Sequence, residues 1–229
     1  MGSIAIIPAR GGSKRIPYKN IREFCGRPII SYSIEAAIRS GCFREVMVST
    51  DDVQIAKMAT QFGAIVPFMR SPKNATDLSS TVDVIEEVLW EYRKQGQEFD
   101  VFCCLYPTAP LVSPQQLKEA HDILMSSDVD CVFPIVRFSY PVWRGLKIED
   151  GLTRMIWPEN YSQRSQDLPL AFHDAGQFYL MRSESLLKKK KLFTDRTRGI
   201  EIPESQAQDI DTEEDWKIAE LKFRLLQEK

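Results

Sequence analysis

The sequence has few of the residues on which metal and redox sites depend. Its 229 residues include two histidines, which excludes a histidine-rich metal site. Five cysteines are an odd number and show no Cys-x-x-Cys spacing, so we expect reduced, buried thiols and neither disulfides nor a thiolate metal site. Glycine (11) and proline (13) are not in excess, which excludes a collagen-like or low-complexity chain.

The sequence also lacks a long apolar run and a large net charge. No segment approaches the ~20 apolar residues of a membrane span, and no basic stretch followed by an apolar one opens the chain. We therefore expect a cytoplasmic protein with no membrane partner and no secretory signal. With 30 Lys and Arg against 32 Asp and Glu, the net charge of −2 leaves no global field for a nucleic-acid polymer. A small anionic substrate is not excluded, because a chain with a net charge near zero can still contain a local cluster of basic residues.

What is present is an alternation of short apolar runs with amphipathic segments. The apolar runs predict strands at 4–7, 45–49, 64–66, 100–105, 131–136 and 177–181. Helical spacing predicts helices at 29–40, 53–62, 81–94, 114–126 and 215–227. This order predicts an α/β domain spanning residues 1–229, with a mainly parallel sheet and helices on both faces. Such a sheet binds ligands at the carboxyl ends of its strands.

The alternation breaks at residues 137–172. This stretch holds Pro141, Trp143, Trp157 and Pro169 with little periodicity. We interpret it as an excursion from the sheet, either a hairpin or an arm that reaches a second chain.

The loop after the first strand, IPARGGSKRIPYKN (7–20), is the most informative stretch. Gly11 and Gly12 let the backbone turn sharply and present N–H groups to an anion. Four cations lie around this glycine pair: Arg10, Lys14, Arg15 and Lys19. The combination favours a polyphosphate site over the alternative, a surface turn with solvated cations. The chain has no GxxxxGK[ST] and no GxGxxG, so neither a P-loop nor a Rossmann dinucleotide site is expected.

The segment IPARGGSKRIPYKNIREFCGRPIISYSIEAA (7–37) resembles the opening signature of the CMP-sialic-acid synthetase family of cytidylyltransferases. Further matches follow in order: VSTDD (48–52), the charged and Thr-rich patch 70–81, YPTAPL (106–111), RSQDLP (164–169), DAGQFY (174–179) and DIDTEEDW (209–216). The resemblance covers nearly the whole chain. HDAGQFY (173–179) and PVWR (141–144) are most similar to the branch of the family that acts on pseudaminic acid.

The resemblance implies a Rossmann-like nucleotidyltransferase domain of the nucleotide-diphospho-sugar transferase type. It also implies a Mg²⁺-dependent reaction of CTP with a nonulosonic acid, a nine-carbon α-keto acid sugar, giving the CMP-sugar and pyrophosphate. The anomeric hydroxyl attacks the α-phosphorus of CTP. The resemblance further implies a homodimer, with residues 137–172 as the dimerisation arm. Exposed positions for Trp143 and Trp157 are part of that expectation.

For the nucleotide, the resemblance implies roles that begin in the glycine loop. Arg10 and Lys19 are the expected catalytic residues, which stabilise charge as pyrophosphate leaves. The other expected nucleotide-binding residues are Ala9, Gly11, Gly12, Ser13, Asn20, Arg70, Ser80 and Thr81. The last three are expected to frame the cytosine. Ser80 is as well explained as the N-cap of the helix at 81–94, so that alternative stays open.

For the metal, the expected ligands are Asp209 and Asp211. In an extended segment, residues two apart point to one side, and two carboxylates there suit Mg²⁺. Spacing alone favours a helix cap, with Asp211 or Thr212 as N-cap and Glu214 or Asp215 in the first turn. The resemblance favours the metal site instead, because an Asp-x-Asp pair near the C-terminus binds metal in the family.

For the sugar, Arg164 is the expected partner of the carboxylate, because a guanidinium binds a carboxylate with two hydrogen bonds. The other expected sugar-binding residues are Tyr106, Asp174, Gln177 and Tyr179. His173 is either a sugar contact or a structural residue.

The choice of acid depends on departures from the sialic-acid branch of the family. That branch usually has QPTSPLR where this chain has Tyr106, Ala109 and Val112. N-acetylneuraminic acid is therefore less expected than pseudaminic acid. Legionaminic acid, N-acetylneuraminic acid and Kdo remain alternatives, as does a catalytically inactive CTP-binding regulatory protein.

Overall fold

The first strand, β1 (Ser3–Pro8), lies inside the sheet because both of its faces are apolar. In the computed structural model, which describes residues 2–228, no residue from Ile4 to Ile7 is exposed. Alternate side chains point to opposite faces, so Ala5 and Ile7 join one apolar cluster while Ile4 and Ile6 join another. The strand pairs in parallel with β4 (Glu45–Ser49) and β5 (Val101–Leu105).

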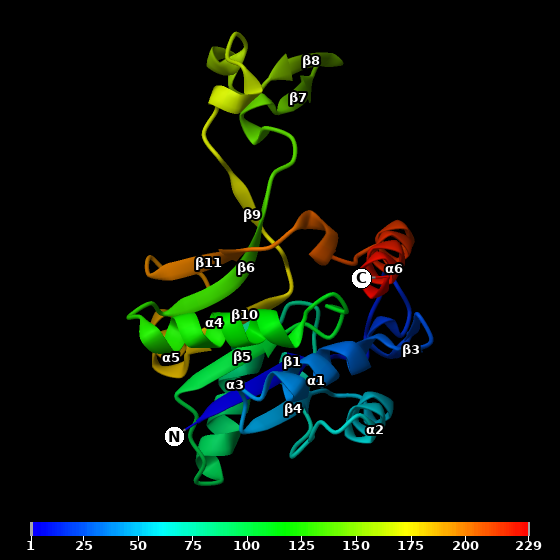
Figure 1. The fold of residues 1–229 in the computed structure, drawn as a ribbon. Coiled ribbons are helices and arrows are strands. Elements are labelled where there is room, and N and C mark those ends of the chain that lie inside the picture. Colours follow the sequence, from blue (N-terminus) through cyan, green and yellow to red (C-terminus); the bar gives the residue numbers. More distant parts are fainter. Residues whose placement is uncertain (1, 229) are drawn as a thin grey trace.

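Helices cover both faces of the sheet, as predicted (Figure 1). The face of Ala5 packs against α1 (Ile29–Ser40), α2 (Val53–Gln61) and α4 (Pro114–Ser126). The face of Ile4 packs against α3 (Thr81–Lys94) and α5 (Ser183–Lys189). The last helix, α6 (Glu213–Gln227), packs through Trp216 against the small hairpin of β2 (Glu23–Phe24) and β3 (Arg27–Pro28).

The described residues form a seven-stranded sheet of order β11-β6-β10-β5-β1-β4, with β9 paired to β6. Its remaining strands are β6 (Cys131–Arg137), β9 (Phe172–Asp174), β10 (Phe178–Arg182) and β11 (Thr197–Glu201). The prediction of a mainly parallel sheet is confirmed, but β10 runs antiparallel to both neighbours. The chain leaves along β6 and returns along β9 with no crossover helix between them, so it re-enters the sheet in the opposite direction.

The predicted excursion from the sheet is confirmed. Residues 138–171 project from the end of β6 and β9 and carry the hairpin of β7 (Leu146–Glu149) and β8 (Leu152–Met155) (Figure 1). We call this segment the arm. The expectation that Trp143 and Trp157 are exposed is wrong. Both side chains are half-buried: their rings pack edge to face at 5.6 Å, and Trp143 Nε1 donates to the Pro169 carbonyl at 2.8 Å, which gives the arm a small apolar centre.

One local prediction needs correction, and four strands were missed. Residues 64–66 form a single bridge, Met47 to Ile65, and no strand. Pro67 follows immediately and has no N–H to continue the ladder. Strands β2, β3, β9 and β11 were not predicted, because two to five residues with mixed polarity carry no clear period. In residues 2–228, no helix is both long enough and apolar enough to cross a membrane.

Candidate active site

Two hydrogen bonds hold the glycine loop after β1 in place, one to the backbone of β4 and one from a side chain of the loop itself. The Ala9 N–H donates to the Ser49 carbonyl at 2.9 Å, so the buried Ala9 acts as a structural anchor. The buried Asn20 closes the loop by donating from Nδ2 to the Arg10 carbonyl at 2.9 Å. A Cβ on Gly11 would lie 2.7 Å from Asp52 Oδ2, so a side chain at this position would displace the loop.

A cavity of about 250 Å³ opens between this loop and the segments that follow β4 and β5. Seven of the predicted residues line it: Arg10, Ser13, Lys19, Asn20, Arg70, Thr81 and Tyr106. Lys14, Arg15, Ser79 and Thr108 also line it, and of these only the two cations stood out in the sequence. Residues far apart in the chain thus meet at the carboxyl ends of β1 and β5, as the topology predicts.

Every cation of the glycine loop holds a carboxylate in this structure. Arg10 binds Asp77 at 2.6 Å, and Lys14 binds the same carboxylate. Arg15 and Lys19 both bind Asp211, at 2.7 and 3.4 Å. The Gly11 N–H donates to Asp51 Oδ1 at 3.0 Å. The loop therefore presents several adjacent cations and N–H donors to anionic oxygens, as binding of a polyphosphate requires.

Arg70 is the buried cation of the cavity, with 7% of its surface exposed. Its Nε donates to Ser49 Oγ at 3.1 Å and its Nη2 to the Ser49 carbonyl at 2.5 Å. Burial lowers the pKa of Arg70, while the nearby carboxylates of Asp51 and Glu87 raise it. These bonds fix the guanidinium as a rigid positive group in the cavity wall.

Ser80 is the N-cap of α3. Its hydroxyl accepts from the Asp83 N–H at 3.2 Å, and Asp83 completes the capping box. The helix-cap alternative is thereby confirmed. Ser80 is absent from the cavity lining, while its neighbours Ser79 and Thr81 contribute to it. A nucleotide contact of Ser80 stays a prediction.

Tyr106 connects the cavity to the predicted sugar-binding residues. Its ring meets Tyr179 edge to face at 6.1 Å, and the Tyr179 hydroxyl bonds to Asp174. The other oxygen of Asp174 accepts from the Gly176 N–H at 2.8 Å. Burial raises the pKa of Tyr106 to about 12, and the charges of Asp174 and Asp209 also raise it. Three predicted sugar-binding residues therefore lie together beside the cavity.

Asp209 and Asp211 are on the segment before α6, and neither carboxylate caps the helix, although the Asp211 N–H donates to Asp215 Oδ2 at 3.1 Å. Thr212 is the N-cap and Asp215 completes the capping box, so the cap and the acidic pair are different residues. Asp209 lies beside Gly176, where a Cβ would be 3.7 Å from the Asp209 Cγ. Loss of hydration raises the pKa of Asp209, and the charge of Asp211 raises it further. A cation between the two carboxylates would relieve this repulsion.

The remaining predicted sugar-binding residues lie elsewhere. Arg164 is on the arm, exposed, with its Nε donating to Asp167 at 2.8 Å. Gln177 is buried, with 1% of its surface exposed, and its Nε2 donates to the Gln206 carbonyl at 2.6 Å. His173 is exposed on β9 and packs against Phe138 at 5.0 Å, which is a structural contact at the base of the arm.

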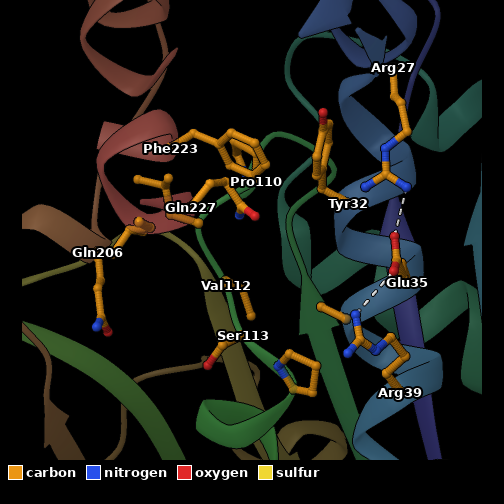
Figure 2. Close-up of a pocket in the computed structure, with 14 residues that line it drawn as sticks. Arg27, Tyr32, Glu35, Arg39, Pro110, Val112, Ser113, Gln206, Phe223 and Gln227 are labelled. Carbon is orange, nitrogen blue, oxygen red and sulfur yellow. Dashed lines mark hydrogen bonds and ion pairs between the residues drawn. The ribbon is translucent and has the colours of Figure 1, made fainter. Parts of the chain in front are cut away.

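A second, larger cavity of about 440 Å³ lies between α1 and α6 (Figure 2). Arg27, Glu35 and Arg39 line one side as a row of ion pairs, while Phe223 and Gln206 stand opposite. None of the predicted site residues lines it. The glycine-loop cavity is smaller but is lined by the four cations of the glycine loop and by Arg70, so we take it as the candidate active site.

Comparison with known proteins shows which family the chain is similar to. A sequence model of the family described as cytidylyltransferase matches residues 4–227. The chain is 39% identical to the pseudaminic acid cytidylyltransferase of Campylobacter jejuni serotype O:2, over 98% of this chain and 97% of that protein. It is 33% identical to the CMP-N,N'-diacetyllegionaminic acid synthase of Legionella pneumophila, over 100% and 99% of the two chains. A solved CMP:2-keto-3-deoxy-manno-octonic acid synthetase complexed with CTP has the same fold, with a TM-score of 0.72, 19% identity and full coverage of both chains.

Proposed function

The chain belongs to the cytidylyltransferase family, and from this premise we propose that it joins CTP to pseudaminic acid, giving CMP-pseudaminic acid and pyrophosphate. The resemblance that the motifs predict is confirmed, and the protein is an enzyme of the nucleotidyltransferase class. The observation that carries the proposal is the glycine loop, whose cations and amide already hold carboxylates around one cavity. The identity of the acid is the more specific part of the proposal and is argued separately below.

In the proposed mechanism, this chain supplies position and positive charge. Arg10, Lys14 and Arg15 exchange their carboxylate partners for phosphate oxygens of CTP. Lys19 is more buried than the other loop cations, with 18% of its side chain exposed, and we place it against the oxygens that gain charge as pyrophosphate leaves. The sugar hydroxyl approaches from the side of Tyr106 and Tyr179 and attacks the α-phosphorus. Holding both substrates in line makes the reaction effectively unimolecular.

Asp209 and Asp211 fit a hard divalent cation such as Mg²⁺. Both offer carboxylate oxygens, and the pKa of Asp209 is raised partly because the charge of Asp211 is near. When bound, Mg²⁺ would neutralise negative charge on the phosphates. In the described residues, no cluster of three or more His, Cys, Asp or Glu side chains is arranged to hold a metal. The remaining ligands would therefore be water and phosphate, as Mg²⁺ commonly uses.

The choice of pseudaminic acid rests on the relatives and is tested by a panel of acids. The two Campylobacter jejuni relatives named as pseudaminic acid cytidylyltransferases are 39% and 38% identical to this chain, against 33% for the legionaminic acid enzyme. Pyrophosphate release should be measured with CTP and each of pseudaminic, legionaminic and N-acetylneuraminic acids and Kdo. We expect the highest kcat/KM with pseudaminic acid. Preference for another acid would overturn this choice, and CTP binding without turnover on any acid would overturn the proposed activity.

We also propose that the protein is a homodimer and that the arm forms the interface. Apolar side chains of the arm are largely exposed, including Tyr140 at 85% and Ile148 at 77%. Arg164 lies on the arm, and the interactions of its guanidinium are with Asp167, three residues away. In a dimer, an arm that projects from one copy would bring its Arg164 to the sugar-binding residues of the other.

The five cysteines are free thiols, and we propose the cytoplasm as the place of action.

Exchange of Arg164 for lysine tests its proposed contact with the sugar carboxylate. We expect Arg164→Lys to raise the KM for the acid about 10-fold, because lysine cannot make the two parallel hydrogen bonds of a guanidinium. The KM for CTP should stay within about twofold. Steady-state kinetics with each substrate varied in turn give both values. Arg154→Lys, on β8 of the same arm, is the matched control. Equal changes in both KM values would remove Arg164 from the sugar site.

Removal of the Asp77 charge should strengthen CTP binding. Asp77 occupies Arg10 and Lys14, so the triphosphate must displace its carboxylate. These pairs are exposed and individually weak, so we expect Asp77→Asn to lower the Kd for CTP about two- to five-fold. Calorimetry without the acid measures this Kd. Asp150→Asn removes the same charge from the tip of the β7–β8 hairpin and should leave the Kd unchanged. An unchanged or higher Kd in Asp77→Asn would show that Asp77 does not compete with CTP.

A further inference from the structure

Gln177 is placed where it cannot touch a sugar in the described conformation. It is 1% exposed, and its backbone carbonyl accepts from the Tyr106 N–H at 2.9 Å, which extends the pairing of β10 with β5. Its side-chain Nε2 donates to the Gln206 carbonyl at 2.6 Å. A buried amide that reaches another segment in this way fixes that segment relative to the sheet.

Gln206 is held by a second buried glutamine. Gln116, on the first turn of α4, donates from Nε2 to Gln206 Oε1 at 2.8 Å. Gln116 is itself fixed, because its Oε1 accepts from the Ser113 N–H at 2.8 Å in the capping box of α4. Gln206 is thus bound at its backbone carbonyl by Gln177, the residue before β10, and at its side chain by Gln116 of α4.

Gln206 faces a cavity on its other side. Gln206 lines the cavity of about 440 Å³ between α1 and α6 (Figure 2). A side chain that borders a cavity has fewer packing neighbours there, so the hydrogen bonds of Gln206 contribute more to its position. The bonds from Gln177 and Gln116 therefore carry more of the positional constraint than they would in a packed core.

The chain that follows Gln206 leads directly to the predicted metal ligands. Asp209 and Asp211 follow within five residues, and Asp209 lies beside Gly176, the neighbour of Gln177. We propose that Gln177 is a positioning residue, which, through Gln206 and with Gln116, sets the distance of Asp209 and Asp211 from the glycine loop. This proposal rests on the proposed function, because it takes the two aspartates as the Mg²⁺ ligands. It replaces the prediction that Gln177 binds the sugar.

The test separates metal binding from sugar binding in one variant. Gln177→Leu keeps a similar volume and removes the amide. We expect binding of Mn²⁺, used as a probe for Mg²⁺, to weaken about 10-fold. This is the lower end of the effect of removing a group bonded directly to a metal ligand, because Gln177 acts through Gln206. Mn²⁺ binding is followed by the electron paramagnetic resonance signal of the free ion, at saturating CTP and without the acid. The Mn²⁺ bound by CTP in the absence of protein is measured separately and subtracted. The half-saturating Mg²⁺ concentration for turnover should rise equally. Excess Mg²⁺ should restore kcat, and the KM for the acid should stay within about twofold.

Two further variants make the outcome specific. Gln116→Leu acts on the same residue from α4, so it should weaken Mn²⁺ binding as well, and the double variant should be less impaired than the product of the single effects. Gln115→Leu, an exposed neighbour on α4, is the control and should bind Mn²⁺ like the original chain. Thermal denaturation of each variant without metal reports whether it folds.

The outcomes distinguish this inference from the proposed function. A rise in the KM for the acid with unchanged Mn²⁺ binding in Gln177→Leu would restore Gln177 as a sugar ligand and overturn the inference. A lower Tm with unchanged Mn²⁺ binding would also overturn it, because the role would then be structural only. Failure of the unaltered chain to release pyrophosphate with any acid of the panel would instead remove the proposed function.

Discussion

Lys19→Met is expected to lower kcat about 10²- to 10³-fold, the usual cost of removing one group that stabilises charge in a transition state. Lys19 has 18% of its side chain exposed, against 81% for Lys14, so its charge is less screened by water. Its ammonium group binds both Asp211 and the Ile210 carbonyl, which places it between the glycine loop and the acidic pair. The KM for CTP should rise far less than kcat falls, because several other cations bind the ground-state triphosphate. Single-turnover pyrophosphate release gives the chemical rate directly.

Lys14→Met is the matched control for Lys19. It removes an identical charge from the same loop, but Lys14 is exposed and paired with the exposed Asp77. We expect it to change the KM for CTP a few-fold at most and to leave kcat nearly unaltered. Lys19→Arg keeps the positive charge and alters its position. Its kcat therefore shows whether the charge alone or the exact position of the charge determines the contribution of Lys19 to the chemical step. Equal losses of kcat in Lys14→Met and Lys19→Met would show that Lys19 has no special role in the chemical step.

Asp209→Asn should make the protein more stable and less active. The pKa of Asp209 is raised in the folded chain, because neighbouring atoms displace part of the water around this exposed side chain and Asp211 repels its charge. A carboxyl group with a raised pKa stabilises the fold below its unfolded pKa, and this contribution is lost as the pH rises through the folded pKa. At pH 7 the ionised Asp209 therefore lowers stability, and asparagine removes that cost. Catalysis should fall about 100-fold or more if the residue holds the metal.

Thermal denaturation at two pH values measures the stability part of this prediction. In a chelator at pH 7, the Tm of Asp209→Asn should exceed that of the original chain, and the difference should narrow as the pH falls toward ~4. Mg²⁺ with CTP should raise the Tm of the original chain and have less effect on the variant. Asp195→Asn, an exposed aspartate away from the cavity, is the control. A lower Tm for Asp209→Asn at pH 7 would contradict the assigned repulsion.

Local sequence patterns were sufficient to predict most of the elements. The helices α1 and α4 begin and end where predicted, because apolar residues recur every three to four positions and short-range signals mark their ends. Gly41 ends α1 in the left-handed conformation, and Ser113 caps α4. The glycine loop was predicted in the same way, since its glycines and cations are neighbours in the chain. The pattern failed at 64–66, where Pro67 ends the pairing after one bridge.

The candidate site was only partly predictable from residues and motifs. Arg10, Lys19 and Arg70 line one cavity as expected, but Asp77 was not singled out. An acidic residue in a charged loop carries no signal that it will pair with cations more than sixty positions earlier. Likewise, the prediction of a sugar contact for Gln177 took the motif without knowing that the side chain is buried. The proposed roles of Arg164, Gln177 and Asp209 are tested by the variants above.

The sequence by itself determined the five buried strands and five long helices that were predicted correctly, and which loop carries the positive charge. Both properties depend on residues a few positions apart, so periodicity and composition record them directly. The tertiary structure alone decided the partners of those charges. Asp211 meets Arg15 and Lys19 across nearly the whole length of the chain, and Gln206 meets Gln116 and Gln177 from two different elements. Such contacts depend on how the sheet orders its strands, which places β10 antiparallel between β5 and β6, and no local pattern encodes that order.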